Sequence, residues 1–218
     1  MNNPTPLLPY PSIPKIIGIT GGIGSGKSTI ARELASRGYR LYDTDREAKR
    51  LIVEDYALRA QIEALLGSDV YEGNTYRTDL VAQRVFSNPD LLRRLNALVH
   101  PAVRRDIEHL TASIASSLSA QRSFCPKGGP SGVAGLIIES ALLFETGLDD
   151  LCDLTICVTA PENIRIARTM VRDHVSEEQV RARIASQMSE QERAQKADRV
   201  LINDGKMSIS ALIDALFL

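Results

Sequence analysis

Short apolar runs alternate along this chain with longer amphipathic stretches. The apolar runs are too short for most helices, whereas the stretches between them repeat apolar residues at helical spacing. Strands that alternate with helices predict right-handed crossovers and a parallel sheet covered on both faces. We therefore predict an α/β fold with a five-stranded parallel sheet, its strands lying within Lys15–Thr20, Arg40–Asp45, Gly135–Ser140, Leu154–Ala160 and Arg199–Asp204.

One interval departs from this alternation. Between Asp45 and Gly135 the chain has almost no strand signal, and an insertion of that length favours a helical subdomain rather than a loop. We predict this domain over residues 46–120 and a Gly/Pro/Ser-rich linker over 121–132. Helical periodicity marks three stretches of the insertion: Glu47–Leu66, Thr78–Phe86 and Asn88–Leu118.

The segment between the last two expected strands is helical and rich in arginine. Its helices are expected to begin at Pro161, Ser176 and Ser189, and the segment spans 161–197. Ser208 is expected to cap a terminal helix. The sheet and its covering helices then occupy 15–45, 133–160 and 198–218, and the proline-rich residues 1–14 are expected to form an extended tail.

Composition narrows the class of protein. The chain has 218 residues, a formal net charge of −1, 44% hydrophobic and 24% charged residues, which is typical of a globular protein and not of a disordered one. The near-zero charge does not indicate a nucleic-acid partner, and no apolar run has the length of a membrane span. Three cysteines without a CxxC pair and scattered histidines favour a reduced cytoplasmic protein without a metal cluster.

The sharpest motif runs from Gly21 to Ser28, Gly-Gly-Ile-Gly-Ser-Gly-Lys-Ser, and matches G-x-x-x-x-G-K-[ST] between an expected strand and an expected helix. Glycines let backbone N–H groups surround a polyphosphate, and the helix N-terminus favours the same anion. Lys27 supplies a cation to the β and γ phosphates, and the Ser28 hydroxyl is placed to bind Mg²⁺. The motif predicts a nucleoside triphosphate site made by Gly22, Ile23, Gly24, Ser25, Gly26, Lys27, Ser28 and Thr29.

Other motifs narrow the class of nucleotide-binding protein. The chain has neither the N-K-x-D nor the D-x-x-G element of GTP switches. Where a large motor ATPase would place an Asp-Glu pair, this chain has Glu139-Ser140. A small core with a helical insertion and an arginine-bearing segment instead favours a small-molecule kinase.

The second expected strand ends in Asp43-Thr44-Asp45, at the sheet edge where ligands gather. If the strand continues that far, alternation puts both carboxylates on one side, and one of them could accept the proton of an attacking hydroxyl. The alternative is an ordinary helix cap. The candidates for holding the transferred phosphoryl group are Arg165, Arg168, Arg172, Arg181 and Arg183; the alternative is a solvated basic face, which we expect above all for Arg165.

Taken in order, the motifs resemble the dephospho-CoA kinase family. The resemblance covers nearly the whole chain, from about Lys15 to Gly205, and departs from the family at Ala141, where a proline is usual. It rests on Gly18–Ser28, Asp43–Asp45 with Ala48, Leu98–Pro101, Leu142–Glu145, Arg168–Asp173, Arg183–Gln187 and Asn203–Gly205.

This resemblance implies a P-loop kinase that phosphorylates the ribose 3′-hydroxyl of dephospho-CoA with ATP and Mg²⁺, the last step of coenzyme A biosynthesis. It implies a CoA-binding role for the helical insertion and a lid over 161–197, in a monomer or weak oligomer. It makes Asp45 the base, with Lys27 and Arg168 also catalytic. It places Arg172, Asn203 and Gly205 at ATP, and Asp43, His100, Leu142 and Glu145 on the acceptor side; for His100 a buried histidine without substrate contact is the alternative.

Two other functions stay open. A shikimate-type kinase is the first, because Leu41–Asp45 resembles the acceptor strand of that family, although this chain lacks its Gly-Gly-Gly loop. A regulatory protein that binds ATP without phosphorylating a small acceptor is the second. Turnover of shikimate, or tight ATP binding without turnover, would favour these alternatives.

Overall fold

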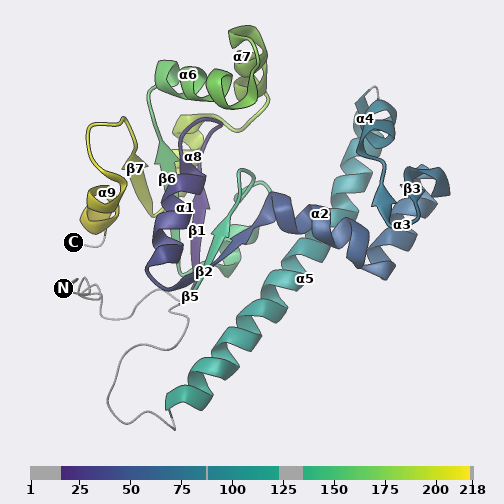
Figure 1. Ribbon diagram of the computed structural model, residues 1–218, viewed down its shortest axis with the longest axis horizontal. Helices are drawn as coiled ribbons and strands as arrows, with labels where there is room; N and C mark the ends of the chain where they lie inside the picture. The colour runs from purple at the N-terminus through teal and green to yellow at the C-terminus, as the bar shows by residue number, and fades with distance from the viewer. Residues whose placement is uncertain (1–15, 87, 123–134, 217–218) are drawn as a thin grey trace. The chain divides into compact units, whose positions relative to one another are not determined.

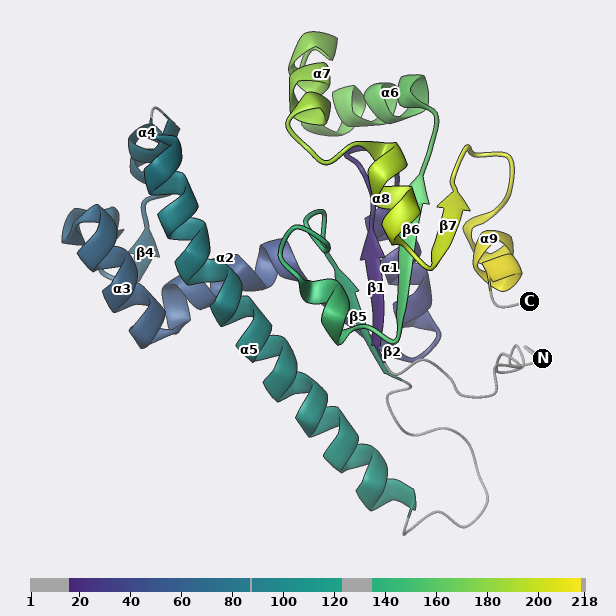
Figure 2. The ribbon, with the colours of Figure 1, turned by 180° about the vertical axis from the view of Figure 1, so that it is seen from behind.

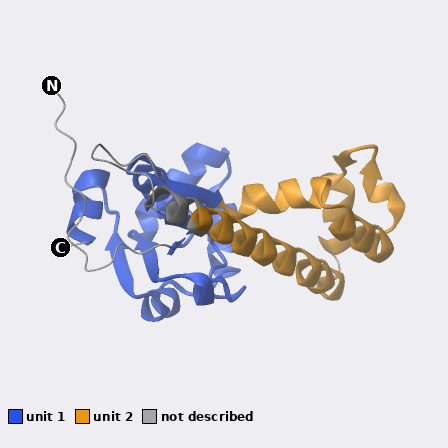
Figure 3. Ribbon diagram, turned by 90° about the horizontal axis from the view of Figure 1, so that it is seen from below, with its two compact units in different colours: residues 1–42, 117–218 blue, residues 43–116 orange. Residues whose placement is uncertain are grey.

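The computed structural model describes residues 16–86, 88–122 and 135–216 (Figure 1). The expected tail 1–14 lies outside the described residues, and so does the expected linker 121–132 apart from its first two residues. The chain forms two compact units, residues 1–42 with 117–218 and residues 43–116 (Figure 3).

The first unit contains a five-stranded sheet in the order β2-β5-β1-β6-β7. β1 pairs in parallel with β5 and β6, and β6 pairs in parallel with β7. The predicted α/β fold and its sheet are confirmed. The strands are β1 (Ile16–Thr20), β2 (Tyr39–Asp43), β5 (Gly135–Glu139), β6 (Leu154–Thr159) and β7 (Arg199–Ile202).

Helices cover both faces of this sheet (Figures 1 and 2). α1 (Lys27–Ser36) and α9 (Ile209–Leu216) lie on one face, and α8 (Glu190–Lys196) and the short 3₁₀ helix η2 (Leu148–Leu151) lie on the other. Ile30 and Ile213 are fully buried in one apolar cluster with strand residues such as Ile156. The continuous apolar runs of the sequence are thus explained by strands that are buried on two sides.

Two further helices, α6 (Glu162–Asp173) and α7 (Glu177–Ala185), stand together beyond the end of the sheet where β6 leads into α6 (Figure 1). α7 begins after Ser176, as predicted, and it does so with a capping box: the Ser176 hydroxyl accepts from Gln179 N while the Gln179 side chain accepts from Ser176 N. The Ser189 hydroxyl caps α8 and Ser208 caps α9, as predicted.

The second unit is mainly helical. It contains α2 (Thr44–Glu54), α3 (Tyr56–Leu66), the 3₁₀ helix η1 (Ser68–Val70), α4 (Thr78–Phe86) and most of α5 (Pro89–Arg122). Asn88 caps α5 through a hydrogen bond from Leu91 N, which explains the Asn-Pro start predicted from the sequence. Among the described residues, no helix is both apolar and long enough for a membrane span.

Two expectations for this unit are corrected. The single periodic stretch Glu47–Leu66 is two helices, because the Asp55 carboxylate accepts from Ala57 N and Leu58 N and starts a new helix. The insertion also contains a small antiparallel hairpin, β3 (Tyr71–Glu72) with β4 (Thr75–Tyr76), where we expected almost no strand. Strands of two residues are too short to show alternation in the sequence.

Candidate functional site

The loop between β1 and α1 has a backbone that only glycine adopts without strain. Gly24 has φ 77° and Gly26, the N-cap of α1, has φ 92°, both in the left-handed region. A Cβ atom at Gly24 would lie 2.7 Å from Thr169 Oγ1 and would also collide with the carbonyl oxygen of Arg165. A Cβ atom at Gly26 would collide with Asn203 Nδ2. The glycines of the motif are therefore required by conformation and by crowding.

Side chains from remote parts of the first unit hold this loop. Asn203 Nδ2 donates to Ser25 O at 2.9 Å, and Ile23 N donates to Gln187 Oε1 at 3.2 Å. The carbonyl oxygen of Asn203 accepts from Arg168 Nη1 at 3.1 Å. Asn203, expected at ATP, is thus a buried support of the loop. Gln187 was part of the family resemblance, but the sequence indicated no contact for it.

The first turn of α1 presents polar side chains in the order that the motif predicts. Thr29 N donates to Gly26 O at 3.0 Å, and Ser28 Oγ donates to Glu139 Oε1, at the end of β5. Lys27 has no side-chain partner that the described residues provide. Glu139 is buried. In the sequence it is notable only because Glu139-Ser140 stands where a motor ATPase would have an Asp-Glu pair.

Ser28 and Glu139 fit the donor set of a magnesium site. Mg²⁺ prefers oxygen ligands and in phosphate-binding enzymes takes only one or two of them from the protein, because phosphates and water supply the rest. A hydroxyl and a carboxylate in direct contact meet that requirement. The described residues contain no cluster of three or more His, Cys, Asp or Glu side chains suited to a metal ion.

The arginines of the segment 161–197 differ in how far carboxylates neutralise them. Arg172 and Arg183 share Asp173 at 2.6 and 3.0 Å, and they hold the pKa of that carboxyl below its usual range. Arg181 pairs with Glu162 at 2.6 Å. Arg168 instead donates to a carbonyl oxygen and has no ion pair within the described parts of the chain. The resemblance implies a catalytic role for Arg168 and a place at ATP for Arg172; of these two, Arg168 is the one whose charge no carboxylate among the described residues neutralises.

The expectation for Arg165 is wrong. Its side chain does not lie on a solvated face: the residue is 4% exposed, and Arg165 Nη2 contacts Glu190 Oε2 of α8 at 2.8 Å. A buried charge requires a partner, and Glu190 provides it. The sequence did not indicate the second buried arginine of the same region, Arg193, because it lies in a helix with a single apolar residue, Ala194, and so shows no apolar face.

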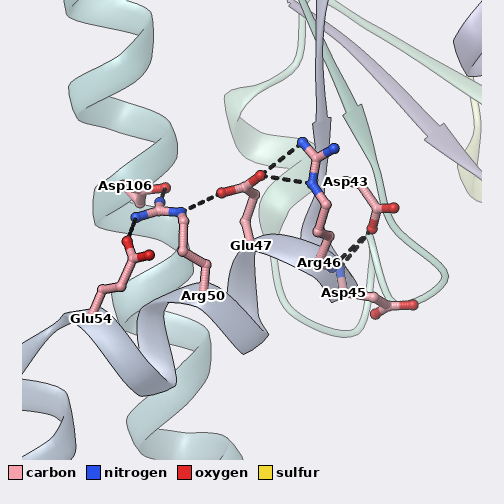
Figure 4. Close-up of polar contacts among 7 residues, drawn as sticks. All are labelled: Asp43, Asp45, Arg46, Glu47, Arg50, Glu54 and Asp106. Carbon is pink, nitrogen blue, oxygen red and sulfur yellow. Dashed lines mark hydrogen bonds and ion pairs between the residues drawn. The ribbon is translucent and has the colours of Figure 1, made fainter. Parts of the chain in front are cut away.

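The two aspartates of Asp43-Thr44-Asp45 have different environments. β2 ends at Asp43, so Asp45 lies in the first turn of α2 and the alternation argument does not apply. Asp43 Oδ1 accepts from Asp45 N and Arg46 N, both at 3.1 Å, which makes Asp43 the helix cap that we weighed as the alternative. The Asp45 carboxylate is exposed and has no partner among the residues that the structure describes (Figure 4).

A chain of ion pairs follows along α2 (Figure 4). Glu47 accepts from Arg46 Nη2 at 2.8 Å and from Arg50 Nε at 2.6 Å. Arg50 also reaches Glu54 at 3.2 Å and Asp106 of α5 at 2.7 Å. Burial alone would raise the pKa of Glu47, but its hydrogen bonds to Arg50 and Arg46 hold that pKa below its ordinary value. These contacts keep the first turns of α2 in place within the second unit.

Four other expected residues lie apart from these groups. His100 is half-buried in α5, directly before Pro101, and burial lowers its pKa, which favours the neutral ring. Leu142 and Glu145 are exposed in the turn after β5. Gly205 follows β7 with φ 86°. Their roles at ATP or at the acceptor stay predictions.

Comparisons with known proteins agree with the motifs. Residues 15–208 match the family model described as dephospho-CoA kinase. The chain is 41% identical to a dephospho-CoA kinase of Porphyromonas gingivalis over 86% of this chain and 85% of that protein. It is 40% identical to a dephospho-CoA kinase of Salinibacter ruber, over 88% of this chain and 90% of that protein. A crystal structure from Thermus thermophilus superimposes with a TM-score of 0.70 at 36% identity, covering 93% of this chain and 94% of that chain.

Proposed function

The chain belongs to the dephospho-CoA kinase family, and on this premise we propose that it transfers the γ-phosphoryl group of ATP to the ribose 3′-hydroxyl of dephospho-CoA. The products are ADP and coenzyme A. The observation that carries the proposal is the glycine loop, whose backbone is fixed by Gln187 and Asn203 at the N-terminus of α1. A loop of this kind presents the N–H groups that it does not use itself to the oxygens of a triphosphate.

On the donor side, we propose that the phosphates are bound by the N–H groups of Gly24, Gly26, Lys27 and Ser28, because those of Ile23, Ser25 and Thr29 already donate within the protein. Lys27 begins α1 without a partner in the described chain, so its ammonium is available to the β and γ groups. Arg168 lies beside the loop, with Nη1 4.0 Å from the position of a Cβ atom at Gly26. Two cations there would stabilise the charge that spreads over the γ-phosphoryl oxygens during transfer.

We propose Ser28 and Glu139 as the protein groups that hold Mg²⁺. When bound, the ion would neutralise charge on the phosphate oxygens. The Ser28 hydroxyl now donates to the Glu139 carboxylate, so the two oxygens already lie together. A change at either residue would therefore remove their mutual hydrogen bond as well as one proposed ligand of the ion.

On the acceptor side, we propose Asp45 as the general base. Its carboxylate accepts the proton of the 3′-hydroxyl while that oxygen bonds to the γ-phosphorus and the bond to the ADP oxygen breaks. The unpartnered carboxylate of Asp45 supports this role, because Asp43 is already engaged as the helix cap. Asp43 would act by fixing the turn that carries Asp45.

The test offers the purified protein ATP with Mg²⁺ and one acceptor at a time. With dephospho-CoA we expect ADP release and a product one phosphoryl group heavier, with the new phosphate on the 3′ oxygen. Phosphorylation of shikimate but not of dephospho-CoA would overturn the proposal. Tight ATP binding without a phosphorylated product from either acceptor would instead favour a regulatory ATP-binding protein.

A further inference from the structure

Two arginines are buried behind the phosphate-binding loop. Arg165 comes from α6 and Arg193, which is 1% exposed, comes from α8. Both guanidinium groups lie against Gly22: a Cβ atom built there would be 2.5 Å from Arg165 Nη1 and 3.7 Å from Arg193 Nη1. The position of Gly22 in the motif is thus crowded by charge and not by apolar side chains.

The buried cluster carries an excess of positive charge. Glu190 pairs with Arg165, at 2.8 Å. Arg193 Nη2 donates to the carbonyl oxygen of Met188 at 2.9 Å, Arg193 Nε has no partner, and the described residues offer Arg193 no ion pair. Two cations therefore share one carboxylate.

A nearby thiol does not supply the missing negative charge. Burial raises the pKa of Cys157 to about 11, while Arg193 lowers it and Glu190 raises it further. The thiol is therefore neutral at physiological pH and leaves the charge of Arg193 uncompensated.

An unpaired buried charge is costly to a folded protein. A packing role alone would be served as well by an uncharged side chain of similar shape, without that cost. The proposed ligand of the loop, however, is a polyanion bound by the same backbone. Its binding would offset the cost, because a charge in a partly dry environment interacts strongly with a bound phosphate.

We propose that Arg193 is a positioning residue for the triphosphate: its buried positive charge, braced by the Arg165–Glu190 pair behind Gly22, strengthens phosphate binding and lowers the stability of the ligand-free protein. The inference rests on the proposed nucleotide site and goes beyond it. It assigns a role to a side chain that lies behind the loop.

Three variants test it. Arg193→Met removes the charge and keeps a long side chain, Arg193→Lys keeps the charge and removes the forked donors, and Lys196→Met removes an exposed charge one turn further along α8. For each, we would measure dissociation constants for ATP and for sodium tripolyphosphate, the melting temperature without ligand, and the KM values of ATP and dephospho-CoA.

We expect Arg193→Met to weaken the binding of ATP and tripolyphosphate by at least about tenfold, which is the effect of one unit charge about 12 Å from another at an effective dielectric constant of about 20. Its melting temperature without ligand should not fall, and the KM of dephospho-CoA should not change. Arg193→Lys should bind ATP much more tightly than the Met variant, and Lys196→Met should match the parent.

Two results would overturn the inference alone, given a parent that binds ATP. One is tripolyphosphate binding to Arg193→Met as tight as to the parent. The other is a lower melting temperature for Arg193→Met together with ATP binding by Arg193→Lys that is as weak as that by Arg193→Met. This pair of results would show a packing role. A parent that binds neither ATP nor tripolyphosphate would overturn the proposed function and this inference together. Turnover of a different acceptor would leave the binding result intact.

Discussion

The phosphate-binding loop of the first unit and the start of α2 in the second unit are held by opposite means. Backbone contacts and buried side chains surround the loop, where the carbonyl oxygen of Arg165 faces Gly24 and Asn203 Nδ2 donates to Ser25 O at 2.9 Å. The start of α2 is held by the Asp43 cap and by partly exposed ion pairs, and the carboxylate proposed as base is exposed.

The difference follows from what each part has to bind. Binding a triphosphate needs many N–H groups in a fixed arrangement, and rigid surroundings provide it without cost at the moment of binding. Proton transfer needs one carboxylate that is not already engaged. We therefore expect the loop to be sensitive to added volume, and the start of α2 to be sensitive to altered chemistry at a single side chain.

The largest expected effect is that of Asp45→Asn, which removes the base while keeping the shape. A positioned base contributes about 10²- to 10⁴-fold to the rate, so kcat should fall by that order. The KM of ATP and the melting temperature should stay close to those of the parent, because the Asp45 side chain holds no other described group in place. Steady-state kinetics with dephospho-CoA as the varied substrate would measure this.

The matched control is Asp43→Asn. Asparagine caps helices about as well as aspartate, so the hydrogen bonds to Asp45 N and Arg46 N should survive, and kcat should fall far less than for Asp45→Asn. Equal losses in the two variants, or a larger loss at Asp43, would reverse the assignment of base and cap.

The next effect concerns volume in the loop. Gly24→Ala places a methyl group against the carbonyl oxygen of Arg165 and forces alanine into a left-handed conformation. Overpacking costs about 1–3 kcal/mol, and we expect ATP affinity to fall about tenfold because the loop must shift to accept the methyl group. Isothermal titration with ATP and thermal unfolding would record both changes.

Gly73→Ala is its control in the other unit. Gly73 has a similar positive φ of 60°, but no heavy atom lies within 4 Å of a Cβ atom built there. Only the conformational cost remains, about 1–2 kcal/mol for a left-handed residue, and ATP affinity should not change. If Gly24→Ala bound ATP like Gly73→Ala, crowding by Arg165 would not control the loop.

Local patterns predicted a large part of the molecule. The five strands follow from apolar runs, and the caps at Ser176 and Ser208 follow from residues that are adjacent in the chain. The loop motif predicted its own conformation, because its glycines, the preceding strand and the following helix all lie within one short segment.

What the sequence did not predict depends on contacts between distant segments. The hydrogen bond from Ile23 N to Gln187 spans 164 positions, and Ser28 meets Glu139 across 111. The burial of Arg165 depends on Glu190, which lies in another helix. No spacing rule along one helix or strand reports such contacts, so these residues of the site became evident only in the fold.

The smallest expected effect concerns the ion pairs along α2. Arg50→Met removes the guanidinium that Glu47, Glu54 and Asp106 share, and it leaves Glu47 with Arg46 alone. The Arg50 side chain is 38% exposed, so solvent screens each pair, and we expect a loss of about 1 kcal/mol in the free energy of unfolding. The loss should shrink in high salt.

Arg93→Met provides the comparison within the same unit. Arg93 pairs with Asp90 on the surface of α5, and its side chain is 77% exposed, so its removal should leave the unfolding free energy unchanged. Urea unfolding of both variants at low and high salt would separate a network from a single pair. Equal stability of the Arg50 and Arg93 variants would mean that the chain of ion pairs does not hold α2, and that the carboxylate of Asp45 is positioned by the Asp43 cap alone.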